Sequence, residues 1–276
     1  MVKIIILLIF INFTVYGSTK DIDKEISEAW KYYEQGKFIK MEKISREILE
    51  KSLKLKYPKG IAEGYYYLGV AYYSMGNLRK ALEYANKAIE YSEKHNNYRW
   101  KSYAYTLAGE ILRSLHKYDD AMKNFKKVLQ IIKENKNKRM LPAAYSNIGN
   151  IYFEKGNYKK AAEFYRKGLI IGKDIKIRKS YIALNSYNLG LSYYKQKNYT
   201  GAINYLKEAS DIYKELGDKK SYISSIFYIA KSYIKTGDYK KAYKILKENY
   251  RIAKEIRASR MYFRTLKKLE EQIGSF

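Results

Sequence analysis

Residues 65–89 read YYYLGVAYYSMGNLRKALEYANKAI, and residues 145–169 read YSNIGNIYFEKGNYKKAAEFYRKGL. The two stretches align position for position, with a glycine near the middle and an alanine five residues after it. Small residues at fixed positions let two helices approach closely, and glycine readily takes the left-handed conformation that ends a helix. Each stretch therefore predicts a hairpin of two helices.

Copies of this pattern extend outward from both stretches along the chain. Close copies cover residues 105–129, 186–210 and 226–250, and a weaker copy covers residues 25–49. Successive copies are 40 residues apart, with one step of 41. The markers that set this period are a small residue or Met at the start of the second helix (Met41, Ala81, Ala121, Ala161, Ala202, Ala242) and a turn residue before it (Gly36, Gly76, His116, Gly156, Lys197, Gly237).

One such hairpin cannot bury its apolar face alone, so neighbouring hairpins are expected to stack. The sequence predicts an all-α fold: a right-handed α-solenoid of about six helix-turn-helix repeats, with thirteen helices in all. The two prolines, Pro58 and Pro142, both avoid helix interiors in this scheme. We expect one array over residues 18–276, with repeats near 22–61, 62–101, 102–141, 142–182, 183–222 and 223–258 and a capping helix at 259–273.

The repeat markers resemble those of the tetratricopeptide-repeat family. The resemblance rests on the Leu-Gly pairs Leu68-Gly69 and Leu189-Gly190, on tyrosines such as Tyr72 and Tyr152, and on the turn glycines and helix-opening alanines. It covers nearly all of the chain after residue 17. The common period of the family is about 34 residues, and the period here is longer. In this respect the sequence resembles the long-helix subclass of the family. This resemblance implies a scaffold that binds other proteins or peptides.

The first seventeen residues predict a secretory signal peptide. Lys3 provides a positive charge, and residues 4–15 are apolar except for Asn12 and Thr14. We expect cleavage after Gly17 and therefore a periplasmic or secreted protein without a stable membrane span; the alternative is an uncleaved N-terminal anchor. The chain contains no cysteine, which excludes a lipid anchor on cysteine, thiol catalysis and thiolate metal sites.

The chain is strongly basic, with a formal net charge of +27. Two interpretations remain open. Lysines spread along the whole sequence favour a background of AT-rich composition, whereas a selected basic surface would bind a polyanion such as an anionic envelope polymer or a membrane surface. Nucleic acid is a poor candidate for an exported protein. The sequence does not predict an oligomeric state.

Residues for catalysis are missing from the pattern. The histidines, His95 and His116, lie in an inter-repeat stretch and at a turn, and the sequence has no phosphate-binding loop, paired metal ligands or nucleophile elbow. We predict no enzyme activity, no cofactor and no metal.

The repeat register instead directs attention to the first helix of each pair, which lines the concave groove in this architecture. The candidate groove residues are Tyr66, Tyr73, Glu110, Arg113, Asn147, Asn150, Tyr187, Asn188, Tyr194, Lys231 and Lys235. Asparagine carries both a donor and an acceptor and can pair with any peptide backbone, a use of groove asparagines that the family resemblance also implies; the alternative is that these amides are merely solvated. Aromatic residues can hold peptide side chains at low entropic cost. Ile26 and Trp30 stand where a carboxylate clamp of some relatives has Lys and Asn, so that binding mode is not expected at the start of the array.

Overall fold

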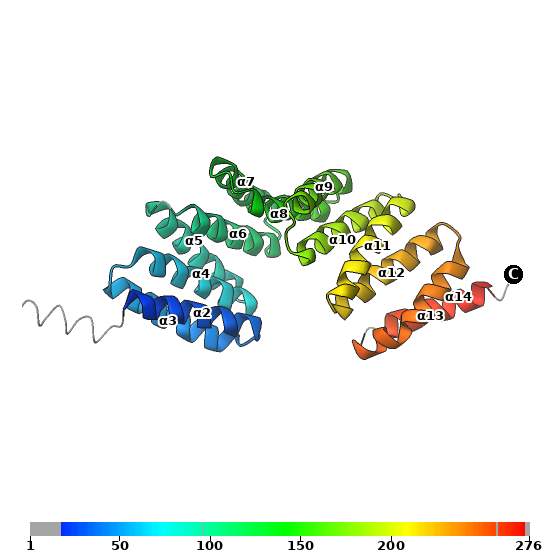
Figure 1. The fold of residues 1–276 in the computed structure, drawn as a ribbon, viewed down its shortest axis with the longest axis horizontal. Coiled ribbons are helices and arrows are strands. Elements are labelled where there is room, and N and C mark those ends of the chain that lie inside the picture. The colour runs from blue at the N-terminus through cyan, green and yellow to red at the C-terminus, as the bar shows by residue number, and fades with distance from the viewer. Residues whose placement is uncertain (1–17, 96, 258, 274–276) are drawn as a thin grey trace, which may run out of the picture. The chain divides into compact units, whose positions relative to one another are not determined.

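The computed structural model describes residues 18–95, 97–257 and 259–273 (Figure 1). The predicted signal peptide, residues 1–17, lies outside them. Within the described ranges the chain forms thirteen α-helices, one 3-10 helix and no strand, which confirms the predicted all-α class. The chain divides into two compact units, Met1–Lys136 and Asn137–Phe276. The prediction of one array over residues 18–276 stays a prediction.

Unit 1 contains three helical pairs. Each first helix packs on its own second helix, and each second helix packs on the next first helix. First helices also contact one another, as α2 does α4 and α4 does α6. The helices are α2 (Thr19–Glu34), α3 (Phe38–Lys54), α4 (Pro58–Ser74), α5 (Leu78–Lys94), α6 (Tyr98–Ser114) and α7 (Tyr118–Glu134).

Unit 2 repeats this scheme and adds a final helix. Its elements are the 3-10 helix η1 (Lys138–Met140) and the helices α8 (Leu141–Glu154), α9 (Tyr158–Asp174), α10 (Lys179–Lys195), α11 (Tyr199–Glu215), α12 (Lys219–Lys235), α13 (Tyr239–Glu255) and α14 (Ser259–Ile273). Most helices have 17 residues, which produces the long period. Pro58 and Pro142 occupy first turns of helices, as predicted.

The marker residues close the helical pairs. The residues that open the second helices, Met41, Ala81, Ala121, Ala161, Ala202 and Ala242, are all fully buried. Glycines of the first helices leave room for aromatic rings of the second: a Cβ built on Gly109 would lie 2.6 Å from Cε1 of Phe125, and one on Gly149 would lie 2.7 Å from Cε1 of Tyr165. Such contacts are shorter than real carbon contacts, so glycine is required there.

The turns between paired helices use left-handed backbone. Gly76 has φ +80° and its neighbour Asn77 donates its backbone N–H to the carbonyl of Tyr72 at 2.8 Å, which ends helix α4. The same turn is made without glycine at His116 (φ 58°) and Lys197 (φ 63°). A side chain with a Cβ is less stable in this conformation, so these two turns carry local strain that the glycine turns avoid.

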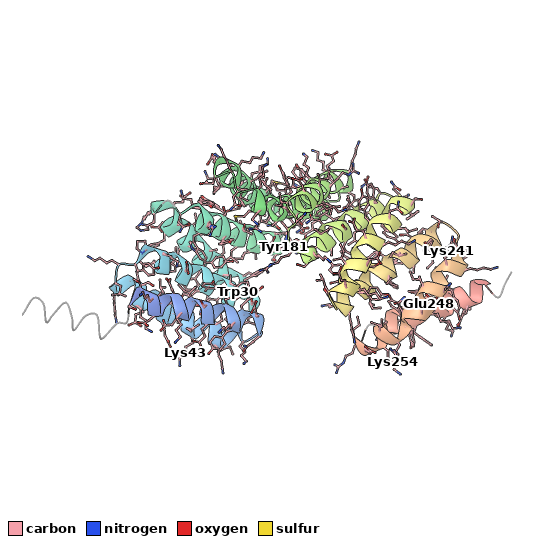
Figure 2. All side chains as sticks on the ribbon, viewed as in Figure 1. Trp30, Lys43, Tyr181, Lys241, Glu248 and Lys254 are labelled. Atoms are coloured by element: carbon pink, nitrogen blue, oxygen red, sulfur yellow. The ribbon has the colours of Figure 1, made fainter. Side chains whose placement is uncertain are left out.

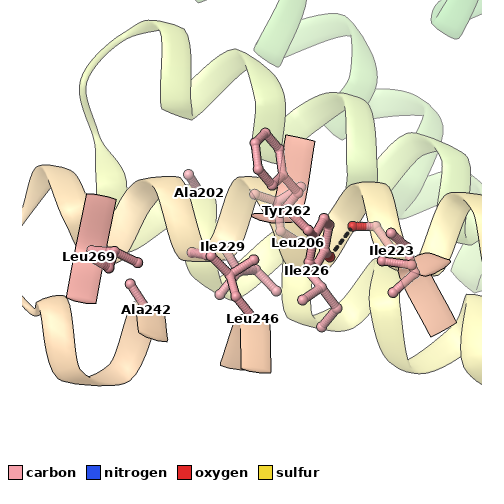
Figure 3. Close-up of a cluster of buried hydrophobic side chains, with 12 residues drawn as sticks. Ala202, Leu206, Ile223, Ile226, Ile229, Ala242, Leu246, Tyr262 and Leu269 are labelled. Carbon is pink, nitrogen blue, oxygen red and sulfur yellow. Dashed lines mark hydrogen bonds between the residues drawn. The ribbon is translucent and has the colours of Figure 1, made fainter. Parts of the chain in front are cut away.

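Helix α14 packs on α13. Figure 3 shows its residues Tyr262 and Leu269 in a cluster of buried hydrophobic side chains of unit 2. Tyr262 and Leu269 are buried in a cluster with Ile223, Ile226 and Leu246. The hydroxyl of Tyr262 donates to the backbone carbonyl of Ile223 at 2.8 Å. This packing agrees with the predicted capping helix.

Most tyrosines serve the core, as expected from their spacing. Their rings pack between helices, and the hydroxyls of several of them reach polar partners. For example, Tyr222 donates to Oδ1 of Asn249 at 2.6 Å, and Tyr105 donates to Glu93 at 2.7 Å. None of the helices in the described ranges is both long enough and apolar enough to span a membrane.

Candidate functional site

In unit 1, a group of aromatic side chains gathers on the first helices. Trp30, which is labelled in Figure 2, stacks on Tyr33 with 5.2 Å between ring centroids. Its side chain is 47% exposed. We call Trp30, Tyr33, Tyr66, Trp100 and Tyr103 the aromatic face of unit 1. Large aromatic groups at such exposure provide apolar contact area for a partner.

The centre of this face is ordered by ring-to-ring contacts. Tyr66 packs edge-on against Trp100 at 5.4 Å, and Trp100 packs edge-on against Tyr103 at 5.3 Å. Burial raises the pKa of the Tyr66 phenol above its ordinary value, so the group stays neutral. Tyr103 is 40% exposed, so the cluster reaches the surface. Tyr66 is therefore partly buried among these rings and partly accessible at the surface.

The remaining candidates of unit 1 are engaged with each other or with neighbouring helices. Arg113 donates to Glu110 at 2.6 Å along helix α6, so each charge offsets the other. The hydroxyls of Tyr73 and Ser114 lie 3.0 Å apart and join α4 to α6. The Glu110–Arg113 pair is about three-quarters buried, and it presents a salt bridge rather than a single charge to a ligand.

Glu63 is a polar residue of unit 1 that the repeat pattern did not reveal. Its side chain is only 2% exposed, on α4, beside the indole of Trp100. Burial is the main reason that its pKa rises to about 7, while nearby Lys59 lowers it and Asp23 raises it. The sequence feature that could have indicated a buried acid is a single glutamate within the apolar run GIAEGYYYLGV.

A pocket of about 320 Å³ opens near this carboxyl. It lies where the N-termini of α4 and α6 meet the C-terminus of α5. Its walls are Tyr57, Pro58, Lys59, Ala62, Tyr91, Ser92, His95, Asn97 and Trp100. The lining is mainly apolar, and its polar side chains include Lys59, His95 and Asn97 but no acid.

In unit 2, five of the candidates lie on first helices together with Tyr228, whose ring packs against those of Tyr187 and Tyr194. We call Asn147, Tyr187, Asn188, Tyr194, Tyr228 and Lys231 the polar face of unit 2. All six are partly exposed. Asn147, Asn188 and Tyr228 occupy equivalent positions of successive repeats, on α8, α10 and α12.

The three predicted asparagines do not share one role. Asn150 accepts a hydrogen bond of 2.7 Å from the hydroxyl of Tyr165 on α9, so its carbonyl is bound to the partner helix. The side chains of Asn147 and Asn188 make no hydrogen bond to any residue in the described ranges. Those two amides keep their full donor and acceptor capacity for a ligand.

The two predicted lysines of unit 2 also differ from each other. The ammonium of Lys231 lies 5.6 Å from the ring centroids of Tyr194 and Phe227 and 5.3 Å from that of Tyr228. Lys235 is exposed at the end of α12. Lys231 is thus held in place by aromatic rings, a favourable cation–π arrangement, whereas Lys235 is a solvated charge.

The part of the chain that the structure describes holds no group of three or more His, Asp or Glu that could hold a metal ion. His116 instead contacts Tyr118, with 2.8 Å between Nδ1 and the hydroxyl.

Paired helices, closed by small residues and repeated at a fixed period, define a helical-repeat protein. Residues 62–95, 102–171 and 181–255 match family models described as tetratricopeptide repeat. The matches cover more than half of the chain, and the chain belongs to the tetratricopeptide-repeat family.

Solved structures show the same fold. A signal-transduction ATPase with numerous domains and a tetratricopeptide-repeat sensor, from Pyrococcus horikoshii, is 25% identical with a TM-score of 0.79. The alignment covers 91% of this chain and only 38% of that protein. A comparison with curated protein sequences gave no match.

Two further similar structures also share the fold. A Rap protein in complex with Competence and Sporulation Factor is 15% identical, with a TM-score of 0.66 over 91% of this chain and 75% of that one. Aspartyl phosphate phosphatase F from Bacillus subtilis is 17% identical, with a TM-score of 0.67 over 92% of this chain and 79% of that one. At these identities the likeness establishes the fold alone.

Proposed function

We propose that this protein is a non-enzymatic scaffold of the cell envelope that binds protein or peptide segments on the first helices of its repeats. The observation that carries the proposal is the pair of surfaces described above. One consists of exposed aromatic rings in unit 1, and the other of amides and hydroxyls without internal partners in unit 2. Rings supply apolar contact, and amides supply backbone pairing that does not depend on ligand sequence.

Two of the similar proteins support this choice of function. The Rap protein was solved in complex with a factor, and the signal-transduction ATPase carries a tetratricopeptide repeat as its sensor. One of these proteins therefore binds a partner, and the other uses its repeats for sensing. For this chain, binding of a protein or peptide is the corresponding proposal.

Location in the envelope rests on the predicted signal peptide. Helix α2 begins at Thr19, and Ser18 caps it by accepting from the backbone N–H of Asp21. Cleavage after Gly17 would leave this cap and every described helix intact. N-terminal sequencing of the protein from the periplasm of an expressing cell should return Ser18 first; protein that keeps Met1 in the membrane fraction would favour the anchored alternative.

Affinity capture tests the binding function. The bait is the chain from Ser18 onward, exposed to envelope extract, with bound proteins identified by mass spectrometry. A variant with Tyr103→Ala, Asn147→Ala and Asn188→Ala alters only partly exposed first-helix residues. A control variant, Ile39→Ala with Ile170→Ala, alters exposed apolar residues of second helices. We expect the first variant to lose the partner and the control to keep it; equal recovery by both would contradict the proposal.

A second candidate function is binding of a polyanion through the basic surface. It is favoured by the uneven distribution of charge, since residues 137–276 contain 30 Lys and Arg but 12 Asp and Glu. Binding of this kind weakens steeply with salt because counterions are released. Partner recovery that is unchanged between low and high salt would exclude it, whereas recovery that falls equally for all variants would support it.

A further inference from the structure

The polar face of unit 2 holds a lysine whose positive charge has no acidic counterpart on the surrounding first helices. Helices α10 and α12 contain no Asp or Glu, and α8 contains one, Glu154, at its last residue. In unit 1, by contrast, α2 alone contains five acids, and α4 and α6 each contain one. The absence of acids from α10 and α12 is therefore specific to unit 2 and does not follow from the repeat pattern.

Three acids on the second helices of unit 2 are paired with lysines other than Lys231. Glu208 pairs with Lys173, Glu215 pairs with Lys179, and Glu255 pairs with Lys219 at 2.7 Å. All three acids belong to second helices. Lys231 makes no ion pair within the described ranges, and its ammonium contacts rings only.

This environment differs from that of the many solvated lysines. Three aromatic rings exclude part of the water around Lys231 and hold the ammonium in one place. A charge in such surroundings interacts more strongly with an opposite charge, because the effective dielectric constant is lower than in water. A fixed group also loses less conformational entropy on binding than a mobile lysine does.

Two of the three rings that contact this ammonium belong to tyrosines, Tyr194 and Tyr228, and the ring of Tyr187 packs against that of Tyr228 with 6.4 Å between centroids. The hydroxyls of Tyr187, Tyr194 and Tyr228 make no hydrogen bond to any residue in the described part of the chain. Burial raises the pKa values of Tyr187 and Tyr194, so both remain protonated and able to donate. Asn188 adds a free amide one residue after Tyr187.

We infer that the polar face of unit 2 binds an acidic peptide segment, with the carboxylate of an Asp or Glu paired to Lys231 and hydrogen-bonded by the neighbouring tyrosine hydroxyls. The inference rests on the proposed peptide-binding function and adds the chemistry of the ligand. Asn147 and Asn188 hold the backbone of the segment, and the rings of Tyr187 and Tyr228 cover its apolar side chains.

Selection from a displayed library of random dodecapeptides tests this assignment on the chain from Ser18 onward. Enriched peptides are synthesised with a fluorophore, and their dissociation constants are measured by fluorescence anisotropy. The test variant is Lys231→Met, which keeps the length and apolar stem of the side chain. The matched control is Lys207→Met on α11, an exposed lysine without an ion pair in the described ranges. Thermal unfolding checks that both variants fold.

We expect enriched peptides with an excess of Asp and Glu, binding at least 10-fold weaker to Lys231→Met and changed less than about twofold by Lys207→Met. Enriched peptides without acids, or acidic peptides that bind Lys231→Met normally, would overturn the inference while leaving peptide binding in place. No enrichment at all would overturn both. Equal weakening by the two variants, with displacement of the peptide by sodium polyphosphate, would show general charge attraction and would also overturn the inference.

Discussion

At the scale of single residues, glycines in the first helices are required by the rings that lie against them. Replacing Gly109 with alanine would normally stabilise a helix by about 1 kcal/mol. Here the new Cβ would lie 2.6 Å from the ring of Phe125, which is fully buried. Overpacking of a rigid ring costs about 1–3 kcal/mol, so we expect Gly109→Ala to lower the free energy of unfolding, as measured by urea denaturation.

A double-mutant cycle separates this clash from other effects. In a Phe125→Leu background the same Gly109→Ala change should cost less, because a leucine can move away from the new methyl group. A gain of stability from Gly109→Ala in the wild-type chain would contradict the close approach of α6 and α7.

Glu63 makes the stability of unit 1 depend on pH. Burial raises its pKa in the folded chain to about 7, above the ordinary value of 4.5. Between these two values the folded state holds a proton that the unfolded state has released, so stability falls as pH rises. The contribution is fully present below about pH 4.5 and is lost as pH passes through about 7.

Urea unfolding at pH 5 and pH 8 measures this effect. The wild-type chain should lose more stability over that interval than Glu63→Gln, whose side chain cannot ionise. Identical losses in the two proteins would show that Glu63 titrates normally.

At the scale of helices, the turns show how equivalent positions differ in local stability. Asn157 caps α9 with its side chain, which accepts from the backbone N–H of Lys160 at 3.1 Å. Lys117 occupies the same place before α7 with nearly the same backbone angles, φ −84° and ψ 64°, but forms no side-chain cap. Helix α7 therefore begins with backbone donors that a capping side chain would satisfy.

Lys117→Asn should supply this cap. We expect the free energy of unfolding to rise by about 0.5–1 kcal/mol, the usual worth of an Asn cap. The matched control is Lys126→Asn, an exposed position inside α7 that loses the same charge. The control should be neutral or slightly destabilising because Asn is a poor helix former. An equal change in the free energy of unfolding of both variants would show that the effect comes from the lost charge and not from a cap.

At the scale of the whole molecule, the helices could be predicted because their determinants are local and repeated. The helix-opening alanines and turn glycines recur at a fixed period, and every one of these alanines is buried as expected. Lys197 and His116 replace glycine without changing the turn. The spacing of the repeats therefore located these two turns, which the residue type alone would not have indicated.

The binding surfaces could be predicted only in part, because side-chain partners come from neighbouring helices. The register placed Asn147, Asn150 and Asn188 on first helices, but only the contact between Asn150 and Tyr165 distinguishes a bound amide from the other two. The rings around Lys231 come from two helices. Glu63 is buried because α6 packs against α4. A single glutamate in the sequence does not indicate this packing.

The proposed function requires ligands to bind to the first helices of the repeats. Hydrogen–deuterium exchange with mass spectrometry, on the chain from Ser18 onward with and without a selected peptide, locates the bound ligand. We expect slower exchange in peptides from first helices, α2, α4 and α6 or α8, α10 and α12, and unchanged exchange in the second helices away from the contact. Protection confined to the second helices or to the turns would contradict it.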